Sequence, residues 1–198
     1  MFQFPAGDSR RKAEIKGNLR RNADFWEENL QANEFVLDIV KNGYSLPFFA
    51  LPDKYEAKRN NLSALRERVF VEAQIEELLE GAFISEVESV PFCVNPLTVA
   101  ENESKLRMVL DMSYVNEFLN VPSFKYEGLS NFSDMVSEND YAIKFDLTSG
   151  YHHIEIHKEH KKYLGFKWIY EDGKEKYFVF DVLPFGCASA CHAFTKVM

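Results

Sequence analysis

Lys144-Phe-Asp-Leu-Thr-Ser-Gly-Tyr-His-His-Ile-Glu-Ile156 is the most informative stretch of this sequence. An apolar run that begins at Tyr141 ends here on an acidic residue, and a turn of small residues follows. A carboxylate in that position would lie at the edge of a sheet, where it could bind a divalent cation. Taken alone, Asp146 also fits the common role of an aspartate that caps a turn. The rest of the chain has to decide between the two roles.

A second unusual stretch, Phe180-Asp-Val-Leu-Pro-Phe-Gly186, precedes a segment from Cys187 that has the pattern of a helix. A proline and then a glycine before a helix let the backbone approach a ligand closely. Between the two stretches, residues 163–169 and 177–183 have the pattern of strands and flank Glu171-Asp-Gly-Lys174. An Asp-Gly pair between two such runs predicts a hairpin and therefore antiparallel pairing.

Further upstream, apolar residues spaced by three and four predict a helix over 63–80, capped by Asn61 or Ser63 and closed by Gly81. The first 62 residues contain a basic run and two short amphipathic segments. From residue 82 the period changes towards two, which predicts further strands. Helices and strands mix without strict alternation, so the predicted class is α+β with a largely antiparallel sheet. The amphipathic segments are 22–31 and 34–42, the strand-like runs are 83–88, 92–99, 105–111, 141–147 and 151–156, and a short helix is expected at 131–137.

Composition excludes several classes of protein. The 198 residues are 46% hydrophobic, which is too apolar for a disordered chain, and they carry a net charge of −8. No apolar run is long enough to span a membrane and no secretion signal is visible, so we expect an intracellular protein of the cytoplasm or nucleus. Three cysteines without a C-x-x-C pair fit a reducing compartment.

The negative charge argues against nucleic-acid binding only if it is evenly spread. It is not, because residues 67–90 carry a net charge of −6 and the remaining chain only −2. The basic N-terminal run, Lys105 and Arg107 therefore remain available to contact phosphates. Net charge alone does not decide the class of partner.

Together, the stretches around Asp146 and Gly186 resemble the reverse transcriptase family. The order Asp-x4-Tyr, His-x-Ile-x-Ile, Leu-Gly-Phe, Leu-Pro-Phe-Gly and Phe-Thr-Lys is similar to the polymerases of gypsy-like and DIRS-like retroelements. Residues 105–111, with Asn116 five positions on, resemble the family's fingers strand. Three upstream runs are similar to the DIRS-like group, so the resemblance covers about residues 18–198. These runs are Asp24-Phe-Trp26, Gly43-Tyr-Ser-Leu-Pro-Phe48 and Val94-Asn-Pro-Leu97.

The resemblance implies polymerase fingers with part of a palm, and templated nucleotidyl transfer to a DNA primer. Its partners would be an RNA or DNA template with primer and deoxynucleoside triphosphates, and its cofactor would be a pair of Mg²⁺ ions. Asp146 would be the first catalytic carboxylate and would bind metal together with the carbonyl of Leu147. Two metal ions suit this chemistry because one activates the attacking oxygen and the other neutralises the leaving group.

The resemblance also implies which residues would bind the incoming nucleotide. Tyr151 matches the aromatic residue that leaves no room for a ribose 2′-hydroxyl and so selects deoxyribonucleotides. Lys105 and Arg107 match the positions that grip the triphosphate, a task suited to cationic side chains. Alternate charges on a strand are equally typical of an ordinary solvated face. Phe185 and Gly186 match the motif that packs against nucleotide and template.

The sequence departs from the family in two ways. It has Cys187 where a leucine is usual and Cys191 where a proline is usual, which leaves the local path of that helix open. The Tyr-x-Asp-Asp hairpin that supplies the other catalytic carboxylates would lie beyond Met198, together with the thumb and any ribonuclease H domain. We therefore expect an N-terminal fragment, with an N-terminal extension and the start of the fingers in 1–62 and the fingers and first part of the palm in 63–198. Such a fragment would not polymerise alone.

Two other interpretations compete with a polymerase. The chain could be a degenerate or domesticated remnant that binds nucleic acid or acts as a scaffold without catalysis. His152, His153, His157 and His160 could instead form a zinc site, although on a strand they would point to opposite faces. Cys187 and Cys191 could imitate a ligand pair, but small buried cysteines are more common.

Overall fold

The computed structural model describes residues 15–102, 105–123, 128, 135–138, 140, 141, 143 and 146–198. The helices within these residues are α1 (Asn18–Arg21), the π-helix η2 (Phe25–Asn29), α2 (Glu34–Asn42), α3 (Leu62–Arg66), α4 (Arg68–Glu80), α5 (Ser113–Asn116), the 3₁₀-helices η3 (Gly150–His153) and η4 (Lys161–Tyr163), and α7 (Ala190–Val197). The strands are β1 (Tyr55–Glu56), β2 (Ile84–Val87), β3 (Cys93–Val94), β4 (Leu97–Asn102), β5 (Lys105–Leu110), β6 (Gly165–Ile169) and β7 (Glu175–Phe180).

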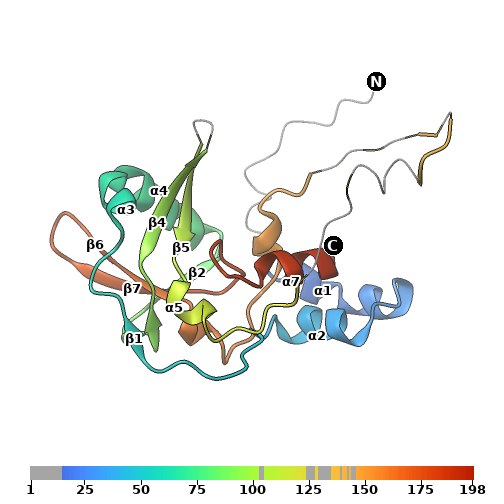
Figure 1. Ribbon diagram of the computed structural model, residues 1–198, viewed down its shortest axis with the longest axis horizontal. Helices are drawn as coiled ribbons and strands as arrows, with labels where there is room; N and C mark the ends of the chain where they lie inside the picture. The colour runs from blue at the N-terminus through green and yellow to red at the C-terminus, as the bar shows by residue number, and fades with distance from the viewer. Residues whose placement is uncertain are drawn as a thin grey trace.

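Two sheets organise the chain, as Figure 1 shows. The larger sheet has the order β1-β3-β6-β7-β2, with antiparallel β6–β7 and β2–β7 pairs and parallel β1–β3 and β3–β6 pairs. The smaller sheet is the antiparallel ribbon of β4 and β5. Helices and mixed, largely antiparallel sheets confirm the predicted α+β class.

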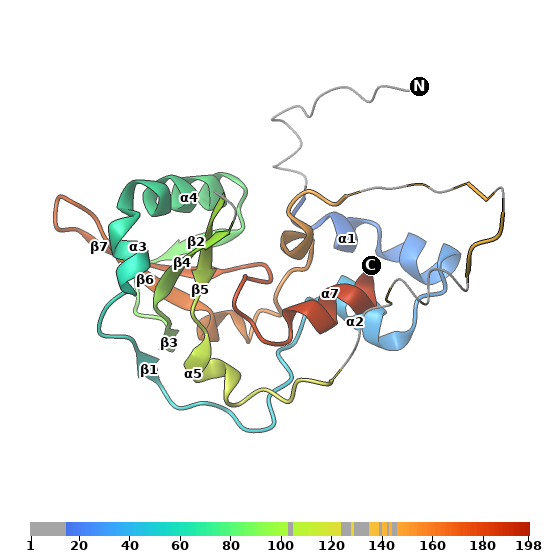
Figure 2. The same ribbon diagram turned by 45° about the horizontal axis from the view of Figure 1, so that its top comes forward.

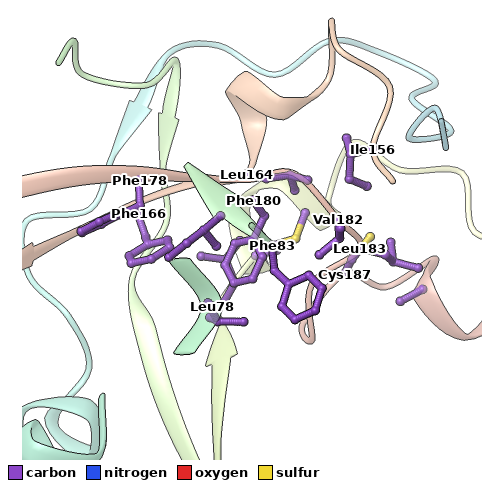
Figure 3. Packing of buried hydrophobic residues seen from close by; sticks show 14 of the residues in the cluster. Leu78, Phe83, Ile156, Leu164, Phe166, Phe178, Phe180, Val182, Leu183 and Cys187 are labelled. Carbon is purple, nitrogen blue, oxygen red and sulfur yellow. The ribbon is translucent and has the colours of Figure 1, made fainter. Parts of the chain in front are cut away.

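The predicted hairpin is present and contributes much of the core. Residues 170–174 connect β6 to β7, and Gly173 takes the positive φ of 81° that such a turn needs. Phe166 pairs with Phe178 in register, and the two fully buried rings stack at 5.1 Å between centroids. Figure 3 shows these rings continuing into a buried cluster that includes Leu78 of α4 and Phe83.

The helix predicted over 63–80 is two helices. The chain breaks at Glu67, whose backbone (φ −95°, ψ 39°) is not helical, so α3 and α4 change direction there. Asn61 is the N-cap residue, but its side chain donates to Thr98 and Asp111 instead of capping the helix. Ser63 likewise accepts from the backbone of Val99, so both candidate caps connect the helix to the β4–β5 ribbon.

Several predicted strands are also shorter or different. The strand predicted at 92–99 is interrupted at Asn95 and Pro96, which separate β3 from β4. Residues 151–156 were expected to be a strand, but the chain forms η3 because local bonds such as Ile154 N to Tyr151 O (3.1 Å) replace a ladder. The predicted helix at 131–137 falls largely outside the described residues. Of the strand predicted at 141–147, residues 142, 144 and 145 also lie outside them, and the described residues 141, 143, 146 and 147 belong to no strand.

Helix α7 lies beside α1 and α2 in both Figure 1 and Figure 2, away from the larger sheet. It begins at Ala190 and not at Cys187, because residues 187–189 form a turn first. The rings of Phe35 on α2 and His192 on α7 lie 6.2 Å apart. Of the helices formed by described residues, none has the length and apolar character to cross a membrane.

Candidate nucleotide-binding site

The Pro-Phe-Gly turn lies directly against strand β5. The backbone N–H of Leu110 donates to the carbonyl of Phe185 at 3.0 Å. Gly186 has a φ of +109°, and a Cβ there would lie only 1.8 Å from the carbonyl oxygen of Leu110. Only glycine permits both this conformation and this approach. The turn thereby joins two segments that the sequence analysis assigned to nucleotide binding.

Asn116 at the end of α5 fixes the same turn from the other side. Its Nδ2 donates to the carbonyl of Gly186 at 2.9 Å, and its Oδ1 accepts from the N–H of Ala188 at 3.0 Å. A single amide therefore satisfies two backbone groups of a segment that is 70 residues away. The sequence showed Asn116 only as part of the fingers resemblance, and this contact explains why an asparagine suits the position.

Tyr151 lies between aromatic side chains from two other segments. Its ring centroid is 5.0 Å from that of Phe185 and 5.3 Å from that of Phe194 on α7. The preceding Gly150 leaves room for Phe194, because a Cβ at Gly150 would lie 3.0 Å from that ring. At the tip of Tyr151, the hydroxyl oxygen is 3.0 Å from Sγ of Cys191. Two aromatic rings thus contact the ring of Tyr151, and Cys191 contacts its hydroxyl.

Arg107 shares a cavity with Phe185. Lys105 and Arg107 are exposed on β5, opposite Asn102 and Ala100 of β4, and neither forms an ion pair with a described residue. The cavity holds about 100 Å³ between the ribbon, α4 and β7, and it is lined by Gln74, Leu78, Leu106, Arg107, Met108, His152, Phe180 and Phe185. Arg107 is therefore close to the Tyr151–Phe185 cluster, whereas Lys105 lies two residues further out along the strand.

His152 is an unexpected member of this cavity. Its ring lies 4.5 Å from Phe83 and 6.2 Å from Phe185, between centroids. Burial, with a smaller contribution from the nearby His153, lowers the pKa of His152 to about 4. Its Nδ1 is buried without a hydrogen-bond partner. From the sequence His152 was a candidate only for a zinc site, whereas in the structure it is a neutral ring beside Phe185.

Asp146 and Leu147 are exposed residues in an irregular segment before η3. The carboxylate of Asp146 and the carbonyl of Leu147 are hard oxygen donors, which Mg²⁺ prefers. No group of three or more His, Cys, Asp or Glu in the described part of the chain could hold a metal ion. The donors thus fit a Mg²⁺ ion that arrives with nucleotide phosphates, which typically has only one or two protein carboxylates. They do not fit an all-protein cage.

Several of the histidines and cysteines considered as zinc ligands instead form hydrogen bonds within the protein. Nδ1 of His160 accepts from the backbone N–H of Leu46 at 2.8 Å, and His153 bonds to the carbonyl of Thr148 at 3.1 Å. Cys187 is buried and its Sγ lies 3.3 Å from the hydroxyl of Ser189. These hydrogen bonds occupy polar atoms that a zinc ion would need.

Asp181 is the polar residue of the second motif whose importance the sequence did not show. It is 4% exposed, and its carboxylate accepts from Lys16 (3.0 Å), Lys161 (2.6 Å) and Ser85 (2.6 Å). Burial raises the pKa of Asp181, but these hydrogen bonds outweigh burial and hold the pKa below its ordinary value. Lys16 also donates to the carbonyl of Ala82 at 2.6 Å, so this cluster ties the N-terminal segment to the larger sheet.

Comparison with known proteins gives one informative similarity. The chain is 28% identical over 132 residues to the "Putative enzymatic polyprotein" of Cassava vein mosaic virus. The matched region is 63% of this chain and 19% of the viral protein, so the chain spans about a fifth of its relative. No protein-family model matches the sequence. The similarity supports a relationship to retroelement polyproteins.

Proposed function

We propose that this chain forms the nucleotide-binding side of a retroelement polymerase of the reverse transcriptase type. The observation that carries the proposal is the contact between two distant motifs at Gly186. The Pro-Phe-Gly turn bonds to β5 at Leu110, and Arg107 lies on the same strand and lines the same cavity as Phe185. The cationic Arg107 thus lies close to the aromatic pair of Tyr151 and Phe185. A nucleoside triphosphate needs both, a cation for its phosphates and an aromatic surface for its sugar and base.

Each group has a distinct task in this proposal. Arg107, exposed and without an ion pair to a described residue, donates to phosphate oxygens, and Lys105 extends the positive charge outward along β5. Tyr151 lies against the sugar and excludes a 2′-hydroxyl. Asp146 and the carbonyl of Leu147 bind the Mg²⁺ ion that accompanies the phosphates. When bound, Mg²⁺ supplies charge neutralisation at the reacting phosphoryl group.

Direct binding of a Mg²⁺–deoxynucleotide complex to the full chain tests the proposal. A fluorescent deoxynucleotide is titrated with the wild-type chain, with Arg107→Ala and with the control Lys158→Ala, which removes an equal charge from an exposed site elsewhere. We expect Arg107→Ala to weaken binding about tenfold or more, because hydrogen bonds to charged groups contribute roughly 1.5–3 kcal/mol. Lys158→Ala should bind like the wild type.

Asp146→Asn provides a second arm, because it should remove the dependence of binding on Mg²⁺ while the fold persists. Binding that is absent in the wild type, or equal in Arg107→Ala and Lys158→Ala, would exclude the nucleotide site. Retained affinity for a primer–template without any affinity for nucleotides would favour the non-catalytic nucleic-acid-binding alternative instead.

A further inference from the structure

Cys191 contacts the tip of the side chain to which the proposed function gives sugar selection. Its Sγ lies 3.0 Å from the hydroxyl oxygen of Tyr151, within hydrogen-bonding distance. The thiol is on the first turn of α7, and the side chain is half-buried. No other cysteine of the chain is in this position, because Cys93 and Cys187 are buried at other points of the core.

We propose that Cys191 is a positioning residue that sets how strongly Tyr151 discriminates deoxyribonucleotides from ribonucleotides. This inference rests on the proposed function, because it concerns the same nucleotide site. Phe185 and Phe194 contact the ring of Tyr151 at tilted and edge-on angles, and Cys191 contacts its hydroxyl end. The contact with Cys191 holds that end.

The physical reason is steric. An aromatic ring excludes a 2′-hydroxyl only if it cannot tilt aside when a ribonucleotide enters. A ring that is held at its tip must break the contact with Cys191 in order to tilt, and a typical hydrogen bond of this kind changes an equilibrium by about fivefold. The contact should therefore weaken ribonucleotide binding and leave deoxyribonucleotide binding nearly unchanged.

The first measurement tests the contact without any nucleotide. The full chain is treated with iodoacetamide, and alkylation of each cysteine is followed by mass spectrometry. In Tyr151→Phe, which keeps the ring and removes the hydroxyl, we expect Cys191 to react about fivefold faster. Cys93 and Cys187 serve as internal controls, because burial raises the pKa of both thiols and they should stay slow in both proteins. An unchanged rate at Cys191 overturns the proposal.

The second measurement compares the affinities of the chain for Mg²⁺–dATP and Mg²⁺–ATP. We expect Cys191→Ala to reduce the preference for dATP about fivefold by tighter binding of ATP, and Cys191→Ser to restore it because a hydroxyl can bond to Tyr151. Lys196→Ala, exposed on the same helix, is the matched control. If the wild type binds dATP and Cys191→Ala keeps the same preference for dATP over ATP, the role of Cys191 is overturned and the proposed function stands. No binding of either nucleotide to the wild type overturns the proposed function and this inference with it.

Discussion

Replacement of Gly186 by alanine tests how the Pro-Phe-Gly turn is built. The residue has a φ of +109°, which an L side chain rarely adopts, and the new Cβ would lie 1.8 Å from the carbonyl oxygen of Leu110. That oxygen belongs to the backbone of β5 and cannot rotate away as a side chain could. The turn must therefore separate from the strand, and the hydrogen bond from Leu110 to Phe185 must lengthen or break.

Gly173 provides a matched control for the size of this effect. It also has a positive φ, of +81°, but a Cβ there would meet no atom within 4 Å. Gly173→Ala should therefore cost only the backbone strain, about 1 kcal/mol. Gly186→Ala adds overpacking of roughly 1–3 kcal/mol and a lost backbone hydrogen bond of about 1 kcal/mol. We expect a total loss of about 3–5 kcal/mol in the free energy of unfolding.

Urea denaturation of the full chain, followed by far-UV circular dichroism, measures the difference. At a slope of about 2 kcal/mol per molar urea, an additional loss of about 2–4 kcal/mol lowers the midpoint of Gly186→Ala by about 1–2 M relative to Gly173→Ala. Equal midpoints for the two variants would refute the close approach of Gly186 to β5. They would also remove the contact on which the nucleotide site depends.

Two further predictions concern buried titratable groups. Asp181→Asn should lower the free energy of unfolding by about 3 kcal/mol at pH 7, because it leaves the Lys16 and Lys161 ammonium groups without a carboxylate. Since the folded pKa of Asp181 is lowered, this deficit should shrink as pH falls below about 4, and a deficit that is constant with pH would contradict it. The pKa of His152 is about 4 in the folded chain and 6.5 in the unfolded chain, so protons bind more tightly to the unfolded chain. The free energy of unfolding should therefore fall by about 3 kcal/mol between pH 6.5 and pH 4. His152→Phe should abolish that loss in urea titrations across this range, and the same acid sensitivity in both proteins would show another group to be responsible.

The sequence predicted best the elements whose signal is local. The Asp-Gly turn before Lys174 needed only its own residues, because Gly173 supplies the positive φ and the flanking runs pair around it. The strand predicted at 151–156 failed for the opposite reason. Glu155 and Ile156 form only single bridges, to Val182 and Tyr44, and the carbonyl of Ile154 accepts from Leu183. The residues before them close local 3₁₀ bonds.

Parts of the candidate site were beyond sequence reasoning because their partners are remote. Asp181 stands within an apolar run, and nothing nearby in the chain indicates that Lys16, 165 residues away, will bond to it. The same holds for Asn116, because its two partners, Gly186 and Ala188, are 70 and 72 residues further along the chain. The grouping of Arg107, Tyr151 and Phe185 came from the resemblance, and the identity of Gly186 as a residue that must lack Cβ came from the geometry.

Cys187 and Cys191 stand where the reverse transcriptases that the sequence resembles usually have leucine and proline. Cys191 is the second residue of α7, within the first turn, where N–H groups have no partner inside the helix. A proline is tolerated in that turn for the same reason, so its absence costs no helical hydrogen bond. Cys187 is buried as a leucine would be. The exchange at position 191 thus leaves the helix intact and places a thiol against the hydroxyl of Tyr151, so any functional difference should appear in sugar selection before it appears in stability.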